Sequence, residues 1–377
     1  MIDGVCDAAF SEVRDVLAAN LDSGEDLGAA VAVFVDGRCV VDLWGGLADQ
    51  RAGRPWRRDT AAVTFSATKA VTAAAALLLA ERGRLDVSDR VASHWPEFAP
   101  NGKDAITLEQ VLAHQAGLPA FDRPISVSEA ADAEAMARQL AGQTPEWAPG
   151  SAHGYHALTF GWLVGEVVQR VSGRPIAAVV AEEFGADLHF GVREADAVDL
   201  ARLAAGRPLK AADRIAAERT VAELVRASSD PSSPLQRSTA NPLASFNQPE
   251  VLAAGWPAAG LVCTARALAD FYRRLVDGTL LSRGTVREAI RTRASGADRT
   301  LVLDSAFGLG FMRPSPSMWL PPVAREHAFG HPGASGALGF GDLEAGVAFA
   351  YVPNLTHPAL GDRRAYRLAG AVYAALA

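Results

Sequence analysis

The sequence predicts an α+β fold in which an antiparallel sheet is built from both ends of the chain, flanked by helices, and a mainly helical domain is inserted between them. Two observations predict this arrangement. Runs of β-branched and aromatic residues occur early, over 30–44, and return late, within 306–352, whereas helical periodicity dominates between them. Elements segregated in this way pack as a sheet covered by helices. We expect residues 1–85 and 255–377 to form the α/β domain that holds the sheet, and residues 86–254 to form the inserted domain.

The first predicted elements are a helix over Phe10–Leu21 and a β-hairpin. Asp36-Gly37 joins the β-rich runs Ala30–Val35 and Arg38–Trp44. Asp-Gly between two such runs is the strongest short-range hairpin signal. The first run is apolar on both faces, so we expect it to lie inside a covered sheet. Gly45-Gly46 is expected to end the second strand.

Helices dominate the middle of the chain, and strands return near its end. Helical spacing predicts Thr107–Ala113, a stretch that runs to Leu140, Ala157–Val171, Ile176–Glu183, Thr220–Ala227 and Ala265–Val276. Ser228–Pro249 is rich in Ser, Pro and Asn and is predicted to be a loop, and a loop of this length is usually functional. Strands are predicted at Ala306–Met312, Ala337–Phe340 and Val347–Val352, and a final amphipathic helix at Arg364–Ala377.

Ser66 and Lys69 form the pattern Ser-x-x-Lys at the start of an apolar helix, predicted over Val71–Ala80 and ended by Gly83. Three residues apart, the two side chains share one face. Serine becomes a nucleophile when a base takes its proton, and a lysine is such a base when burial lowers its pKa. The basic residues are almost all Arg, which stays protonated, and the only other lysines are Lys103 and Lys210. The alternative reading of the pattern is an ordinary exposed helix start.

Two later stretches concentrate reactive groups. Tyr155 lies in the run 149–157, directly before a predicted helix, where a tyrosine can act as a general acid or base. The alternative is a core tyrosine with a satisfied hydroxyl. His331 lies in the run 329–336, whose small residues suit a close approach of the backbone to a ligand and whose edge can offer an amide to an oxyanion. The alternative there is a Gly-rich turn with a surface histidine.

Together these stretches resemble the serine β-lactamase and penicillin-binding-protein superfamily, which carries Ser-x-x-Lys, a Tyr or Ser motif and a Lys/His-x-Gly strand motif in this order. Ser66-Ala67-Thr68-Lys69 matches the first motif. Tyr155-His156-Ala157 stands where the lactamases have Tyr-x-Asn, and His331-Pro332-Gly333 stands where they have Lys-Thr-Gly. The chain more closely resembles the family VIII carboxylesterases, which have a class C β-lactamase-like fold, because Leu112–Pro119 and Asp42–Gly46 also match segments of that branch.

The resemblance implies a β-lactamase/transpeptidase-like fold and a role for each motif residue. Ser66 is expected to attack an ester carbonyl, Lys69 and Tyr155 to form the base system, and His331 to tune Tyr155. The amides of Ser66 and Ala334 are expected to form the oxyanion hole. Three neighbouring residues are expected to contact the substrate, namely His156, Gly333 and Ser335. His114, in the segment that matches the esterase branch, is expected to be structural.

Two departures from the lactamase motifs favour esters over antibiotics. Ala157 replaces the Asn that in class C β-lactamases contacts the amide side chain of the substrate, and His331 replaces the Lys that helps to hold its carboxylate. The predicted function is therefore a serine carboxylesterase that cleaves short-chain or aryl esters through an acyl-enzyme on Ser66. The acyl and alcohol preferences depend on residues 185–250, a variable region on the substrate side.

Four other functions stay open at this point. An acyltransferase would use the same acyl-enzyme, a β-lactamase or D-amino-acid peptidase would share the chemistry, and a non-catalytic penicillin-binding sensor would stay acylated. An α/β-hydrolase is disfavoured because the nearest approach to Gly-x-Ser-x-Gly, Gly333–Ala337, lacks the last glycine.

Composition excludes several other classes. A net charge of −7 and 21% charged residues do not suggest a nucleic-acid partner or binding to an acidic membrane. No apolar run is long enough to span a bilayer, and the first residues do not read as a signal peptide. Cys6, Cys39 and Cys263 are distant and odd in number, so neither disulfides nor a zinc site is expected. We expect a cytoplasmic protein that needs no metal or cofactor and acts on a small-molecule ester. The sequence does not reveal the oligomeric state.

Overall fold

A computed structural model describes residues 2–185, 187–193, 196, 198–207, 218–357 and 362–377. Within these residues, the main sheet has seven strands in the order β1-β3-β2-β13-β12-β11, with β4 paired to β3, and its neighbouring strands are antiparallel. The first strands of the chain therefore pair with the last ones, as predicted, through the β2–β13 ladder in which Val33 opposes Phe349. The fold is the predicted α+β arrangement.

The elements have the following bounds. The strands are β1 (Ile2–Cys6), β2 (Gly28–Val35), β3 (Arg38–Asp49), β4 (Arg54–Pro55), β5 (Ala62–Val63), β6 (His189–Phe190), β7 (Ala204–Ala205), β8 (Leu261–Cys263), β9 (Ala294–Gly296), β10 (Ser305–Phe307), β11 (Ala328–Pro332), β12 (Leu338–Asp342), β13 (Val347–Pro353) and β14 (Leu355–Thr356). The helices are α1 (Ser11–Asp22), α2 (Thr68–Glu81), α3 (Val91–His94), α4 (Leu108–Leu112), α5 (Val127–Ala130), α6 (Ala133–Gly142), α7 (Thr159–Ser172), α8 (Ile176–Glu183), α9 (Glu218–Ser229), α10 (Pro234–Thr239), α11 (Pro249–Ala254), α12 (Ala265–Val276), α13 (Arg283–Ala289) and α14 (Arg364–Ala374).

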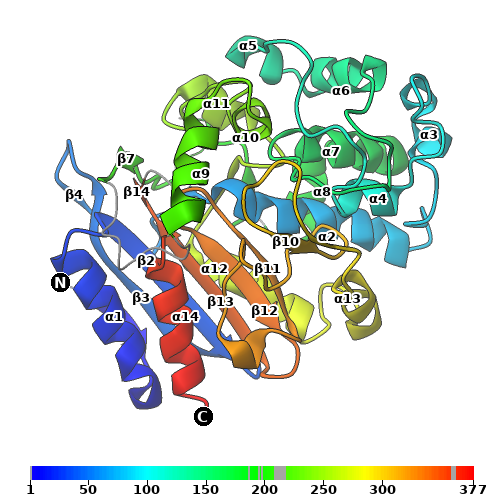
Figure 1. Ribbon diagram of the computed structural model, residues 1–377. Helices are drawn as coiled ribbons and strands as arrows, with labels where there is room; N and C mark the ends of the chain where they lie inside the picture. The colour runs from blue at the N-terminus through cyan, green and yellow to red at the C-terminus, as the bar shows by residue number, and fades with distance from the viewer. Residues whose placement is uncertain (1, 186, 194–195, 197, 208–217, 358–361) are drawn as a thin grey trace.

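Helices cover both faces of the sheet. On one face, α1 and α14 lie side by side near the two termini (Figure 1), and Val31 and Val33 of β2 join their core cluster. On the other face, α12 packs against β2, β12 and β13, and Ala30 and Ala32 join a second core cluster. The alternation of β2 residues between two cores explains why this strand is apolar on both faces.

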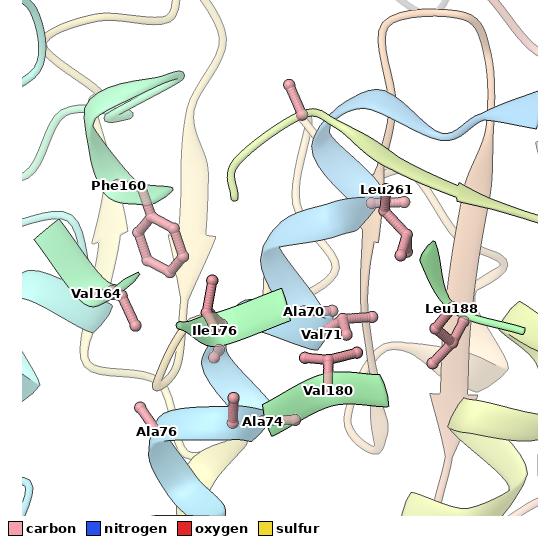
Figure 2. Close-up of a cluster of buried hydrophobic side chains, with 14 of the residues drawn as sticks. Ala70, Val71, Ala74, Ala76, Phe160, Val164, Ile176, Val180, Leu188 and Leu261 are labelled. Atoms are coloured by element: carbon pink, nitrogen blue, oxygen red, sulfur yellow. The ribbon is translucent and has the colours of Figure 1, made fainter. Parts of the chain in front are cut away.

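Helix α2 is the central helix of the second core. Its residues from Thr68 to Leu79 are all buried, and a helix that is apolar all round belongs in the interior of a protein. Figure 2 shows side chains of α7, α8 and β8 around Ala70, Val71 and Ala74. The start of α2, which carries Lys69, is therefore held by packing on every side.

Three predicted elements differ from the structure. The second hairpin strand continues past Gly45-Gly46 to Asp49, because Gly46 takes a φ of 80° without leaving the ladder. The predicted strand Ala306–Met312 is β10 followed by a turn, since Gly310 has a φ of 76° and Met312 bridges back to Phe307. The predicted loop Ser228–Pro249 contains α10, whose Ser233 cap and Pro234 are a helix-start signal.

Among the described residues, no helix combines the length and apolar character required to cross a bilayer. The three cysteines are free thiols. The boundaries 1–85, 255–377 and 86–254 remain a prediction, although Figure 1 shows α3 to α8 grouped beside the sheet.

Candidate active site

Ser66 lies in a single 3₁₀ turn, Phe65–Ala67, directly before α2, rather than in the first turn of the α-helix. Phe65 takes a φ of 49°, which is unusual for a residue with a side chain and marks strain of the kind found at functional sites. Three hydrogen bonds to Leu261 of β8 hold the turn. The amide and Oγ1 of Thr64 donate to the Leu261 carbonyl at 2.9 and 3.1 Å, and the Leu261 amide donates to Thr68 Oγ1 at 3.1 Å. Ser66 is thus presented from a fixed backbone.

The Lys69 amine is buried beside Ser66. The Nζ atom lies 3.2 Å from Ser66 Oγ and 3.0 Å from the carbonyl oxygen of Ala258, and it lies over the Tyr155 ring at 4.8 Å from the centroid. The side chain is fully buried, and burial holds the pKa of Lys69 well below its usual range. The lowered pKa favours the neutral amine, which is the form that can accept the proton of Ser66, so Lys69 has the position of a general base and a pKa shifted toward that role.

Tyr155 is buried on the other side of Ser66. Burial raises the pKa of Tyr155 and the Asp298 carboxylate adds to this shift, whereas a hydrogen bond to Ser66 opposes it. The phenol is therefore neutral at neutral pH and acts as a hydrogen-bond donor. Its ring stacks on Phe307, with the two planes 6° apart.

The backbone around Tyr155 is held by side chains from distant parts of the chain. His114 Nδ1 accepts from the His156 amide at 3.1 Å, and the His114 carbonyl accepts from the Gly154 amide at 3.1 Å. Ser238 Oγ of α10 accepts from the Ala157 amide at 2.9 Å. This arrangement gives His114 a structural role, as expected, and fixes the direction in which Tyr155 points.

His331 lies on β11, the edge strand of the sheet, with its ring centroid 5.8 Å from that of Tyr155. Its Nδ1 donates to the Pro332 carbonyl at 2.7 Å, and its Nε2 has no partner among the described residues. Burial is the main cause that lowers the pKa of His331 to about 3, and repulsion from the protonated form of Lys69 acts in the same direction. The imidazole is therefore neutral, with Nε2 as a free hydrogen-bond acceptor beside Tyr155.

Gly333 and Ala334 begin the turn between β11 and β12. The Gly333 amide donates to the Ala337 carbonyl at 2.7 Å and the Gly336 amide to the Gly333 carbonyl at 2.9 Å, so the turn is tight. A Cβ at Gly333 would lie 2.2 Å from the carbonyl oxygen of Thr64. This glycine allows the turn to lie directly on the segment that presents Ser66. In the described part of the chain, the Ala334 amide donates to no other group, which suits the predicted oxyanion role.

A cavity of about 530 Å³ opens above Ser66. Most of its lining is apolar. The lining residues include Ser66, Tyr155, Ala157, Leu235 of α10, Phe246, Leu301, Leu303, Met312, His331 of β11, Gly333, Ala334 and Tyr366 of α14. No Lys or Arg is among the described residues that line it. In the described part of the chain, no group of three His, Cys, Asp or Glu side chains is placed to hold a metal.

Two of the three residues predicted to contact substrate do not line this cavity. His156 is fully buried, with Nε2 accepting from the Leu118 amide at 3.0 Å and Nδ1 2.6 Å from the Gly154 carbonyl. Ser335 is also fully buried, and its carbonyl accepts from Arg364 Nη2 at 2.8 Å. Both directly follow residues that line the cavity, Tyr155 and Ala334. Gly333 lines the cavity, and its contact with substrate remains a prediction.

Comparison with known proteins agrees with this geometry. The Beta-lactamase family matches residues 13–373. The esterase/beta-lactamase LipL of Mycobacterium tuberculosis is 35% identical over 366 residues, which cover 93% of this chain and 82% of LipL. A penicillin-binding-protein homologue from Caulobacter crescentus has a TM-score of 0.87 at 35% identity, and a family VIII carboxylesterase has a TM-score of 0.88 at 31% identity; both superpositions cover all of each chain.

Proposed function

The chain belongs to the beta-lactamase family, and on this premise we propose that it is a serine carboxylesterase that forms an acyl-enzyme on Ser66. The observation that carries the proposal is the buried amine of Lys69, 3.2 Å from Ser66 Oγ at the floor of an apolar cavity. The names of LipL and of the family VIII carboxylesterase point to the same reaction class.

In the acylation step, neutral Lys69 takes the proton of Ser66 while Oγ attacks the ester carbonyl. The amides of Ser66 and Ala334 stabilise the negative charge that develops on the carbonyl oxygen. The C–O bond to the alcohol then breaks, and Tyr155 donates its phenolic proton to the leaving alkoxide. Lys69 returns a proton to the phenolate, whose ring lies 4.8 Å from Nζ. The acyl group is now on Ser66 and the alcohol has left neutral.

Deacylation uses the same groups in reverse. A water molecule takes the place of the alcohol and gives a proton to the Lys69–Tyr155 pair as it attacks the acyl carbonyl. Breakdown of the tetrahedral intermediate returns a proton to Ser66 Oγ and releases the carboxylic acid. His331 contributes a neutral acceptor near Tyr155 rather than a charge, because its pKa is lowered to about 3.

The cavity favours an uncharged ester over a β-lactam. A lactam brings a carboxylate and an amide, and the described lining offers no cation for the first and only Ala157 at the position of the lactamase Asn for the second. An unpaired polar group costs about 1–3 kcal/mol on burial, which is roughly 10- to 100-fold in rate per group. The apolar lining instead suits the apolar acyl and alcohol groups of short-chain and aryl esters, which are the proposed substrates. The proposed location of the protein is the cytoplasm.

The test is a comparison of kcat/KM for p-nitrophenyl butyrate and for nitrocefin on one preparation. We expect the ester to be preferred by about 10²-fold or more, from two unpaired groups. A fluorophosphonate should label Ser66, and Ser66→Ala should remove nearly all esterase activity. Comparable values for the two substrates, or a label on another serine, would contradict the proposal. Product analysis with an added alcohol separates hydrolysis from acyl transfer.

A further inference from the structure

Asp298 accepts hydrogen bonds from the segment that carries Tyr155 and from the loop that carries Leu301 and Leu303 of the cavity wall. It lies in the loop between β9 and β10, and its side chain is completely buried. Oδ1 accepts from the Tyr155 amide at 3.0 Å, and Oδ2 accepts from Ser305 Oγ at 2.6 Å. Oδ1 also accepts from the amides of Thr300 and Leu301, both at 2.8 Å. Four donors around a carboxylate match the acceptor capacity of its ionised form.

The same loop touches the Tyr155 segment through its backbone. The Arg299 amide donates to the His153 carbonyl at 3.0 Å. A Cβ at Gly154 would lie 2.9 Å from Thr300 Oγ1, so the absence of a side chain there allows the two segments to meet. The loop that carries Asp298 therefore packs against the segment that carries Tyr155 through backbone and side-chain contacts.

Ser305 and His153 complete a closed network behind this contact. Ser305 Oγ donates to Asp298, so its lone pair accepts from His153 Nε2 at 3.0 Å. Serine, histidine and aspartate here do not form a nucleophilic triad, because the hydroxyl lies between the other two and is fully enclosed. The network orients the carboxylate toward the Tyr155 amide.

Asp298 also sets the electrostatic environment of Tyr155. The titratable groups that face or flank this phenol are Lys69 from α2, His114 after α4, His153 and His156 from its own segment, His331 from β11 and Asp298. Among the described residues Asp298 is the one acid in this group, and its charge adds to the rise that burial causes in the pKa of Tyr155. Burial keeps the pKa values of His114, His156 and His331 low, so these rings bring no compensating positive charge at neutral pH.

We propose that Asp298 is the positioning residue of Tyr155 in the esterase reaction: its carboxylate fixes the backbone from which the phenol projects and folds the loop that carries Leu301 and Leu303 into the cavity wall. The inference rests on the proposed esterase function. No motif in the sequence indicates this role, because Asp298 is distant from the three motifs and lies in no recognisable pattern.

Asp298→Asn is the decisive variant, because it keeps the volume of the side chain, removes the charge and places an amide donor where Oδ2 accepts from Ser305, so the oxygen that holds the Tyr155 amide loses its orientation. Misplacement of an acid–base group typically lowers the rate of the chemical step by up to about 10²-fold. We therefore expect kcat for p-nitrophenyl butyrate to fall at least about tenfold, while KM stays within about twofold of the wild-type value. Loss of a nearby negative charge favours the deprotonated form of Tyr155. The alkaline limb of the pH profile of kcat/KM should therefore move to lower pH, by about half a unit or more.

The matched control is Asp304→Asn, which makes the same chemical change at an exposed position of the same loop. It should leave kcat and the pH profile unchanged. If the wild type is active and Asp298→Asn has the same kcat and pH profile, the inference about Asp298 is wrong and the proposed function still stands. The same conclusion follows if Asp304→Asn loses as much kcat as Asp298→Asn. An inactive wild type would overturn the proposed function, and this inference with it.

If Asp298→Asn does not fold, Ser305→Ala tests the positioning role of Asp298 instead. This variant removes one donor to the carboxylate and keeps its charge. We expect a several-fold loss of kcat with an unchanged melting temperature, because the carboxylate is less firmly oriented toward Tyr155. Wild-type kcat in a folded Ser305→Ala protein would overturn the inference.

Discussion

Burial acts in opposite directions on the two side chains that flank Ser66. It lowers the pKa of Lys69 and raises that of Tyr155, because in both cases it disfavours the charged form. The result is a neutral amine beside a neutral phenol, which is the pair of protonation states that acylation needs. Lys69 can accept the proton of Ser66 and Tyr155 can donate a proton to the leaving group, and neither group has to be charged before the reaction begins.

The first prediction at this scale concerns Lys69→Arg. Arginine keeps the positive charge but cannot release its proton, so it cannot take one from Ser66. We expect Lys69→Arg to lose nearly as much kcat/KM as Lys69→Ala, within the 10²–10⁴-fold range of a lost general base. Steady-state kinetics with p-nitrophenyl butyrate measures the loss. Retention of more than about a tenth of the activity would mean that Lys69 acts only as a charge, since a missing base costs at least about 10²-fold.

Gly333→Ala tests the turn that offers the second oxyanion amide. The new Cβ would lie 2.2 Å from the Thr64 carbonyl oxygen, which is backbone and cannot rotate away. The turn must then move off Ser66, and the Ala334 amide moves with it. Loss of one oxyanion donor costs about 10²–10³-fold in kcat, and we expect a loss near the lower figure. Gly370→Ala on α14, where a Cβ meets nothing within 4 Å, should keep full activity.

At the scale of elements, the parts that could be predicted from the sequence are those whose signal is local. The buried helix that begins near Ser66, the Asp36-Gly37 hairpin and α12 follow from composition, periodicity and turn chemistry. Edge strand β1 is not predicted, because three of its five residues are exposed and the other two are only partly buried. A strand of this kind has no alternation to detect.

The residues of the candidate site likewise fall into those that sequence motifs reveal and those that only the three-dimensional structure reveals. Ser66, Lys69, Tyr155 and His331 are recognisable because each lies in a contiguous motif, and the fold brings all four together. Asp298, Ser238 and Arg364 act on backbone groups at distant positions in the sequence. Their roles depend on tertiary contacts, which a single sequence does not display.

Arg364 gives a prediction at the element scale, because the first residue of α14 ties three parts of the fold together. Its buried guanidinium pairs with Asp26 at 2.6 Å and with Asp362, and it donates to the Ser335 carbonyl at 2.8 Å. Breaking a buried pair leaves the other charge uncompensated and costs roughly 3–5 kcal/mol. We expect Arg364→Met to lower the free energy of unfolding by this amount and to lower kcat, since the turn after Ala334 loses its support.

Urea unfolding and ester kinetics on the same preparation check this prediction. The control is the double variant Arg364→Met with Asp26→Asn, which removes the charge that the single variant leaves buried. The double variant should recover part of the lost stability but not the lost kcat, because the hydrogen bond to Ser335 is still absent. Recovery of both would show that the contact with Ser335 does not matter for the reaction.

At the scale of the whole molecule, the active site is assembled where the two cores of the sheet meet the helical region. Tyr155 and Phe307 belong to the core cluster that includes α1 and α14, whereas α2 belongs to the cluster on the other face. The catalytic groups are consequently buried by both cores at once. Such burial tunes their protonation, but it also makes the stability of the fold depend on pH.

The last prediction is that the protein loses stability steeply as the pH falls below about 6.5. In the folded state the pKa of His331 is lowered to about 3 and that of His156 to about 4, in both cases mainly by burial. The ordinary value of a histidine is about 6.5, so between pH 6.5 and 4 the unfolded chain binds protons that the folded chain does not. Stability therefore falls with falling pH through this window, by about 1.4 kcal/mol per pH unit for each such histidine. Urea unfolding at pH 7, 6 and 5 measures the slope. His331→Asn should reduce the slope by the share of one proton. A stability that does not change between pH 7 and 5 would contradict the burial of neutral histidines at this site.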